Sequence, residues 1–387
     1  MQKQIVATAV STALFALSTG AHATNGDQMI AMSAAQAAMG GATVAQAQDA
    51  ATILVNPAGM ADLGMQDVRM DLGFGLLNPP REVNGQESDS NWYMMPAGAA
   101  AFNVNDRLYL GMALGGIAGM GVNVPDISVA AAGGQPVVTT KQVFRFSPAA
   151  ALKVNDALTL GASLNVVNQS LAMSFVGGAG QIDLPQNQQF GFGATLGATY
   201  KINPKLQAGL VYTTKTDVSN MEYHTPTGMT SFDMDIPAAV ALGFAFKPMP
   251  GLLVEFDIKR IFFNDVIDRI AITNPQPGMP AVLPFGWDDQ TVYAIGVKKE
   301  MGPMAISLGF NYGKSPIGTE DVNFNLGSMA IVEKHLSFGI TRKFSDKVSG
   351  SFAYTHAFEN DLTSSVAPAN TIEISQNQYN FNVAYKF

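Results

Sequence analysis

Two basic residues stand out because each alternates with large apolar residues. Arg145 lies between two phenylalanines, and Lys259 follows an isoleucine. Successive side chains of an extended strand point to opposite faces, so both cations face away from these apolar neighbours. A cation on an enclosed face could bind a carboxylate head group. Interior ion pairs are the alternative, and for Lys259 this is the stronger hypothesis because Asp257 and Glu255 share its face.

The sequence lacks the motifs of the common enzyme classes. It contains no cysteine, and no Gly-x-Ser-x-Gly, His-Glu-x-x-His or phosphate-binding glycine loop occurs. His224, His335 and His356 are isolated in sequence, so no metal-ligand spacing is present. A lipid hydrolase that uses His356 with a nearby serine remains an alternative. We otherwise expect no enzymatic activity, no cofactor and no metal.

Charge and the first residues indicate an exported protein that does not bind nucleic acid. The chain has 30 Asp and Glu against 22 Lys and Arg, without a basic run. Residues 1–23 combine a short basic start, an apolar run and the small-x-small sequence Ala21-His22-Ala23. This pattern predicts a signal peptide cleaved before Thr24, and an N-terminal membrane helix is the alternative.

Most of the remaining chain has the two-residue hydrophobic period of β-strands. In residues 188–202 one parity carries Phe190, Phe192, Leu196, Tyr200 and Ile202, and the other carries small or polar residues. Fourteen such segments occur. They begin near residues 66, 92, 107, 142, 157, 188, 206, 234, 251, 289, 303, 333, 347 and 373.

The connections between these segments alternate strictly between short turns and long loops. The long loops lie near residues 77–91, 116–141, 170–188, 216–233, 263–288, 313–332 and 359–372. A meander of hairpins with one short rim and one long rim is typical of outer-membrane barrels. We therefore predict an all-β fold, a 14-stranded antiparallel transmembrane β-barrel over residues 65–387, with a soluble sandwich as the alternative. The only candidate for a membrane helix, residues 108–125, contains five glycines and partly alternates, so we expect a strand there.

The last strand ends in aromatic residues on one parity. Tyr379, Phe381, Tyr385 and the terminal Phe387 alternate with polar or small residues. This resembles the final strand by which outer-membrane barrels are recognised for assembly, so we expect Phe387 to contact the outer-membrane assembly machinery. The outward apolar face implies contact with outer-membrane lipid, and we expect a monomer.

Residues 24–64 precede the first strand and do not alternate. Residues 27–38 have helical composition, and Asn56-Pro57-Ala58-Gly59 predicts a turn. The Ala/Gly-rich segment 33–63, with its Asn56, Pro57 and Ala58 element, followed by fourteen strands and a terminal phenylalanine, resembles the FadL-type long-chain fatty-acid transporters. The resemblance implies that residues 24–64 form a hatch, or plug, inside the barrel lumen.

The same resemblance implies capture of hydrophobic molecules by the third and fourth outer loops. Apolar residues of these loops are the candidate ligand contacts, since methionine lines adaptable apolar surfaces. They are Leu171, Met173, Phe175, Met221, Tyr223, Met229 and Phe232.

The resemblance also implies a lateral exit at a kink in the third strand. That strand alternates up to Leu114 and then meets Gly115 and Gly116, which permit a bulge, although a glycine pair could equally start a loop. We therefore expect passive uptake of hydrophobic small molecules, long-chain fatty acids first, with release into the membrane. Aromatic or other hydrocarbons are the alternative cargo.

Overall fold

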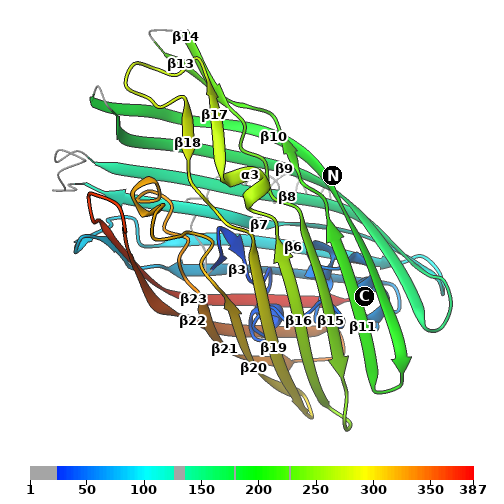
Figure 1. Ribbon diagram of the computed structural model, residues 1–387. Helices are drawn as coiled ribbons and strands as arrows, with labels where there is room; N and C mark the ends of the chain where they lie inside the picture. Colours follow the sequence, from blue (N-terminus) through cyan, green and yellow to red (C-terminus); the bar gives the residue numbers. More distant parts are fainter. Residues whose placement is uncertain (1–23, 126–135, 178–179, 226–227) are drawn as a thin grey trace, which may run out of the picture.

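The computed structural model describes residues 24–387 except 126–135, 178–179 and 226–227. The predicted signal peptide lies outside this range. In the described part, fourteen long strands pair antiparallel in chain order, and the last pairs with the first to close a barrel (Figure 1). The strands are β3 (Val68–Asn78), β6 (Tyr93–Asn103), β7 (Leu108–Val124), β8 (Val137–Lys153), β9 (Leu158–Gly177), β10 (Gly180–Asn203), β11 (Leu206–Thr213), β15 (Ala239–Phe246), β16 (Leu252–Ile261), β19 (Gln290–Met301), β20 (Met304–Gly313), β21 (Lys334–Lys343), β22 (Val348–Thr363) and β23 (Thr371–Lys386).

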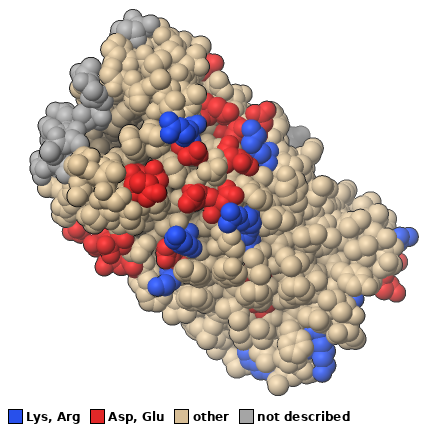
Figure 2. All heavy atoms as spheres, viewed as in Figure 1, with Lys and Arg blue, Asp and Glu red and all other residues tan. Residues whose placement is uncertain are grey.

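The two faces of the barrel wall differ as the two-residue period predicts. Phe192 and Leu196 are 66% and 55% exposed, whereas their neighbour Thr195 is 1% exposed. Figure 2 shows a broad, mostly uncharged band between a belt of charged residues and the opposite rim. Lipid solvates such a band, so the large apolar side chains need no protein core. The predicted 14-stranded transmembrane barrel is confirmed.

Two predicted loops are largely strand. β7 and β8 together occupy much of residues 116–141, and β9 and β10 occupy most of residues 170–188. The prediction was wrong because these strands run past the apolar band, where no lipid imposes alternating side chains. Leu171, Met173 and Phe175 therefore lie on β9, not in a loop.

The remaining long loops carry small elements of their own. β13 (Met221–Thr225), β14 (Gly228–Phe232), β17 (Arg269–Thr273) and β18 (Val282–Pro284) form a separate four-stranded sheet. The other elements are β4 (Arg81–Val83), β5 (Gln86–Glu87), β12 (Asp217–Val218), α3 (Asn264–Ile267) and η3 (Val322–Phe324). None of the helices in the described ranges is long and apolar enough to cross a membrane.

Residues 24–64 fold into short elements that contact the inward face of the barrel. They form β1 (Thr24–Asn25), β2 (Gln28–Met29), α2 (Ala34–Ala37), η1 (Ala50–Leu54) and η2 (Pro57–Asp62). The helix predicted for residues 27–38 is thus only one turn, because β2 pairs with the barrel wall instead. Glycines on the wall allow close approach: a Cβ on Gly309 would lie 2.0 Å from the backbone nitrogen of Gly40.

Candidate functional site

The structure brings Arg145 and Lys259 to one cavity. They enter from β8 and β16, and the cavity, of about 130 Å³, is lined mostly by apolar side chains. One Nη of Arg145 donates to the Leu54 carbonyl, and its buried Nε has no hydrogen-bond partner among the described residues. Neither cation lies within 4 Å of a carboxylate in the described part of the chain. The interior ion pairs considered for these two residues are therefore not formed.

The carboxylates that share the face of Lys259 bind backbone amides instead. Asp257 accepts the N–H groups of Thr43 at 2.7 Å and Val44 at 2.9 Å. Glu255 accepts the N–H groups of the next two residues, 45 and 46, at 2.7 and 2.8 Å. Four successive amides of the N-terminal segment are thus held by β16, and Lys259 remains available to the cavity. No sequence pattern indicates this contact, because backbone donors carry no sequence signature.

A second cavity, of about 500 Å³, lies toward the long-loop end and contains three of the predicted ligand contacts. Leu171, Met173 and Phe175 line it, and none of the described residues that line it is charged. Sequence reasoning missed several further lining residues, whose only signal was the abundance of methionine and phenylalanine. They are Met120, Met234, Met279, Phe285 and Phe324.

The other four predicted ligand contacts line neither of these two cavities. Met221, Tyr223 and Phe232 are at most 1% exposed, and the last two stack with ring centroids 5.6 Å apart. The Tyr223 hydroxyl donates to the Leu171 carbonyl at 3.3 Å, so this sheet supports the wall of the outer cavity. Met229 is 44% exposed at the β13–β14 hairpin.

The wall is interrupted between β6 and β7 at the glycine pair. β7 pairs with β6 as far as Gly115, and its register with β8 shifts between Gly116 and Ala118, so a bulge lies where the glycines permit one. The next β6 residue is Pro96, which lacks an N–H group for pairing.

The N-terminal segment covers this interruption from inside. Gln28 of β2 pairs with Ala118, and the Asp27 carbonyl accepts the N–H of Gly119 at 2.9 Å. The Asp27 carboxylate forms a 2.8 Å salt bridge with Lys141 of β8, and both side chains are at most 2% exposed. A buried ion pair therefore fixes β2 across the gap.

Asn56, Pro57 and Ala58 form the start of η2. The Asn56 side chain accepts the Ala58 N–H at 3.1 Å and donates to the carbonyls of Val44 and Ala198 at 2.8 and 3.2 Å. Pro57 occupies the first helical position, where a missing N–H has no cost. The motif thus caps its own turn and ties it both to the N-terminal segment and to β10.

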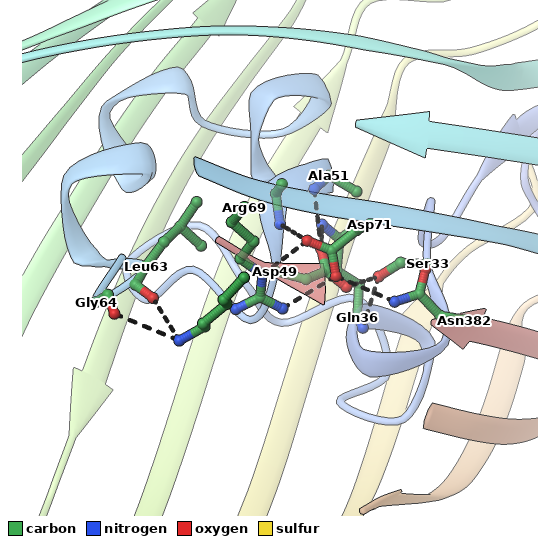
Figure 3. A network of polar contacts seen from close by, with 11 residues as sticks. Ser33, Gln36, Asp49, Ala51, Leu63, Gly64, Arg69, Asp71 and Asn382 are labelled. Atoms are coloured by element: carbon green, nitrogen blue, oxygen red, sulfur yellow. Dashed lines mark hydrogen bonds and ion pairs between the residues drawn. The ribbon is translucent and has the colours of Figure 1, made fainter. Parts of the chain in front are cut away.

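A polar network joins the N-terminal segment to β3 and β23 (Figure 3). Asp49 accepts from the Ser33 hydroxyl at 2.5 Å, and Asp71 accepts from the Ala50 N–H at 3.0 Å. Arg69 forms a 2.7 Å salt bridge with Asp71. Burial, and then the Asp71 charge, raise the pKa of Asp49 to about 6.

We expect this network to strengthen at mildly acidic pH. Because the folded-state pKa of Asp49 lies above its ordinary value of 3.8, the folded state binds a proton more tightly. The stabilisation is full below pH 3.8 and is lost as pH rises through about 6, with a size on the order of 3 kcal/mol. Amide hydrogen exchange of residues 50–54, corrected for intrinsic rates, should be slower at pH 4.5 than at pH 7.5. The Asp49→Asn variant should exchange at the same corrected rate at both pH values. A pH difference that persists in this variant would show that a group other than Asp49 causes it.

The comparisons with known proteins agree with this architecture. The family model described as outer membrane protein transport protein (OMPP1/FadL/TodX) matches residues 12–386. The Pseudomonas putida toluene transporter TodX is 20% identical, with a TM-score of 0.78 over 94% of this chain and 100% of that chain. The Ralstonia pickettii toluene transporter TbuX is 21% identical, with a TM-score of 0.76 over 92% of this chain and 98% of that chain.

A Pseudomonas aeruginosa FadL homologue is 14% identical, with a TM-score of 0.71 over 94% of this chain and 100% of that chain. At these identities the solved structures support the fold alone. No curated protein matches the sequence. The family match covers nearly the whole chain, so the protein belongs to the OMPP1/FadL/TodX family of Gram-negative outer-membrane β-barrel transporters for hydrophobic compounds.

Proposed function

We propose that this protein is a passive uptake channel for hydrophobic molecules that carry a carboxylate, long-chain fatty acids among them. The observation that carries the proposal is the pair Arg145 and Lys259 in one largely apolar cavity. Removing a cation from water costs several kcal/mol unless a partner compensates it. Asp257, the one carboxylate among the described residues that line the cavity, already accepts two backbone N–H groups. A ligand carboxylate is the partner that this arrangement lacks.

The proposed path begins in the outer cavity and ends in the membrane. The described lining of the outer cavity is uncharged and suits an alkyl chain or a ring, and the methionines in this lining adapt to either. Residues 24–64 serve as a hatch that closes the lumen to salts and sugars. The gap beside Gly115 and Gly116 serves as the lateral exit, so the cargo enters lipid directly. For a C16 chain this avoids an exposure to water of about 0.8 kcal/mol per CH₂, or roughly 10 kcal/mol.

Aromatic hydrocarbons are the second candidate cargo. The uncharged outer cavity favours a neutral molecule as much as an alkyl chain. Two of the similar solved structures, TodX and TbuX, are toluene transporters. A hydrocarbon would have no use for the two cations, and this difference separates the candidates.

The test compares uptake of labelled oleate and labelled toluene by cells that express each variant. Arg145→Met and Lys259→Met should each reduce oleate uptake about tenfold or more, the effect of losing one charge-assisted hydrogen bond. Toluene uptake should not change. Lys299→Met is the matched control, because this lysine is exposed on the short-turn side. Equal oleate uptake by all variants at equal protein levels would contradict a carboxylate cargo.

A lipid hydrolase is not the function we propose. His356 lies on β22, its Nδ1 is 3.0 Å from the Asn377 side-chain oxygen, and its ring packs edge-on against Phe358. Neither of these two contacts involves a serine hydroxyl. Ester cleavage by the purified protein, abolished in His356→Gln, would overturn this conclusion.

A further inference from the structure

The size of the inner cavity restricts which carboxylates it can enclose. Its volume of about 130 Å³ is close to that of an apolar protein cavity that binds benzene, about 150 Å³. A long alkyl chain cannot fit in this space, whereas one six-membered ring can. We infer that the inner cavity is a binding site for single-ring aromatic carboxylates of the size of benzoate. This inference rests on the proposed function and narrows its substrate class.

The lining of the cavity matches both ends of such a molecule. Ile117, Val211, Ile236 and Val292 provide apolar contacts for a ring. At the polar end, the unpartnered Nε of Arg145 and the ammonium group of Lys259 can each donate to a carboxylate oxygen. Asp257 also lines the cavity, but two cations against one carboxylate leave the lining positive.

A layer of packed side chains separates the inner cavity from the outer one, since the two cavities share no described lining residue and Ile117, Met234 and Ile236 belong to one buried hydrophobic cluster. On β7, Ile117 lines the inner cavity and Met120 the outer one. Between β14 and β15, Ile236 lines the inner cavity and Met234 the outer one. A long-chain acid can place its head at the cations and its chain in the outer cavity only if this layer moves. A single-ring acid needs no such movement, so it should bind the closed state directly.

The test measures the affinities of benzoate, 2-naphthoate, laurate and toluene for the full-length mature protein in nanodiscs by titration calorimetry. Benzoate should bind at least tenfold more tightly than 2-naphthoate and laurate, because a second ring or a chain requires the layer to move. Arg145→Met and Lys259→Met should each weaken benzoate binding about tenfold or more and leave toluene binding unchanged. Lys299→Met should behave as the wild type, and heat-modifiable migration on gels verifies that each variant is folded.

Two results would overturn the inference. One is equal affinity for benzoate, 2-naphthoate and laurate, which would mean that the cavity does not select by size. The other is benzoate binding that neither substitution weakens. If benzoate fails to bind while oleate uptake still depends on Arg145, the inference fails and the proposed function stands. If neither acid binds or is taken up, both fail.

Discussion

Replacing Lys141 with methionine should release β2 from the barrel wall and open the closed protein to ions. Lys141 and Asp27 form a salt bridge of 2.8 Å with almost no solvent exposure. Removing one member of a buried pair leaves an uncompensated charge and typically costs about 3–5 kcal/mol. Apart from this ion pair, one residue pair and one flanking hydrogen bond join β2 to β7, and Met29 packs against Leu77, Tyr93 and Met95. The cost should therefore be relieved by detachment of residues 24–29 and not by unfolding of the barrel.

Two measurements detect this release. Conductance in planar bilayers should rise above the closed level, and hydrogen exchange at residues 24–29 should become faster. The double variant Asp27→Asn with Lys141→Met removes both charges, so it should recover much of the closed behaviour. Lys299→Met serves as the control for loss of an exposed lysine. Closed-level conductance and unchanged exchange in Lys141→Met would show that the ion pair does not hold the segment.

The barrel was predictable from the sequence because lipid imposes a simple rule on it. Residues such as Phe192 and Leu196 must face outward wherever the wall crosses the apolar layer, so the two-residue period marks each crossing strand. Beyond the apolar layer no lipid contacts the wall, so the side chains there need not alternate. For that reason the sequence pattern predicts loops for the outer parts of β8 and β10, although β8 begins at Val137 and β10 at Gly180.

The site was predictable only in part, because its geometry depends on the N-terminal segment. Parity placed Arg145 and Lys259 on the inward face, and the fold brings them to one cavity. That neither cation forms an ion pair could not be predicted. It follows because Asp257 and Glu255 bind backbone amides that lie more than 200 residues away in sequence. The two cavities could not be predicted for the same reason, because their lining residues come from segments that lie far apart in the sequence.

The break in the barrel wall beside Gly115 could be predicted as a bulge, but its coverage by β2 could not. The glycine pair indicated a break in β7, and the register shift between Gly116 and Ala118 lies there. That β2 would pair across the break at Ala118 had no signal in the sequence, because residues 27–38 have helical composition. Whether cargo leaves at this point stays a prediction, which substitution of the glycines tests.

Replacing Gly115 and Gly116 together with valine should abolish uptake without preventing assembly of the barrel. Valine favours a regular strand and disfavours the bulge, so β7 should straighten toward β6 and narrow the gap. At Gly115 an added Cβ would lie 3.3 Å from a Leu54 methyl group, a contact that a small side-chain shift can accommodate. The barrel should therefore still fold, and heat-modifiable migration at the normal protein level should confirm it.

The readout is uptake of labelled oleate, with binding measured separately by calorimetry. Blocking an exit should lower uptake while the cavities still bind ligand, whereas damage to the cavities would lower both. Gly98→Val is the matched control: Gly98 lies on β6, pairs with Leu114, and faces outward, where its nearest neighbour is the flexible end of Leu72. Because Gly98 lies within the paired part of β6 and β7, on the short-turn side of the gap, its substitution should leave uptake at the wild-type rate. Normal uptake by the double valine variant would exclude Gly115 and Gly116 as the exit and favour a path past residues 24–64.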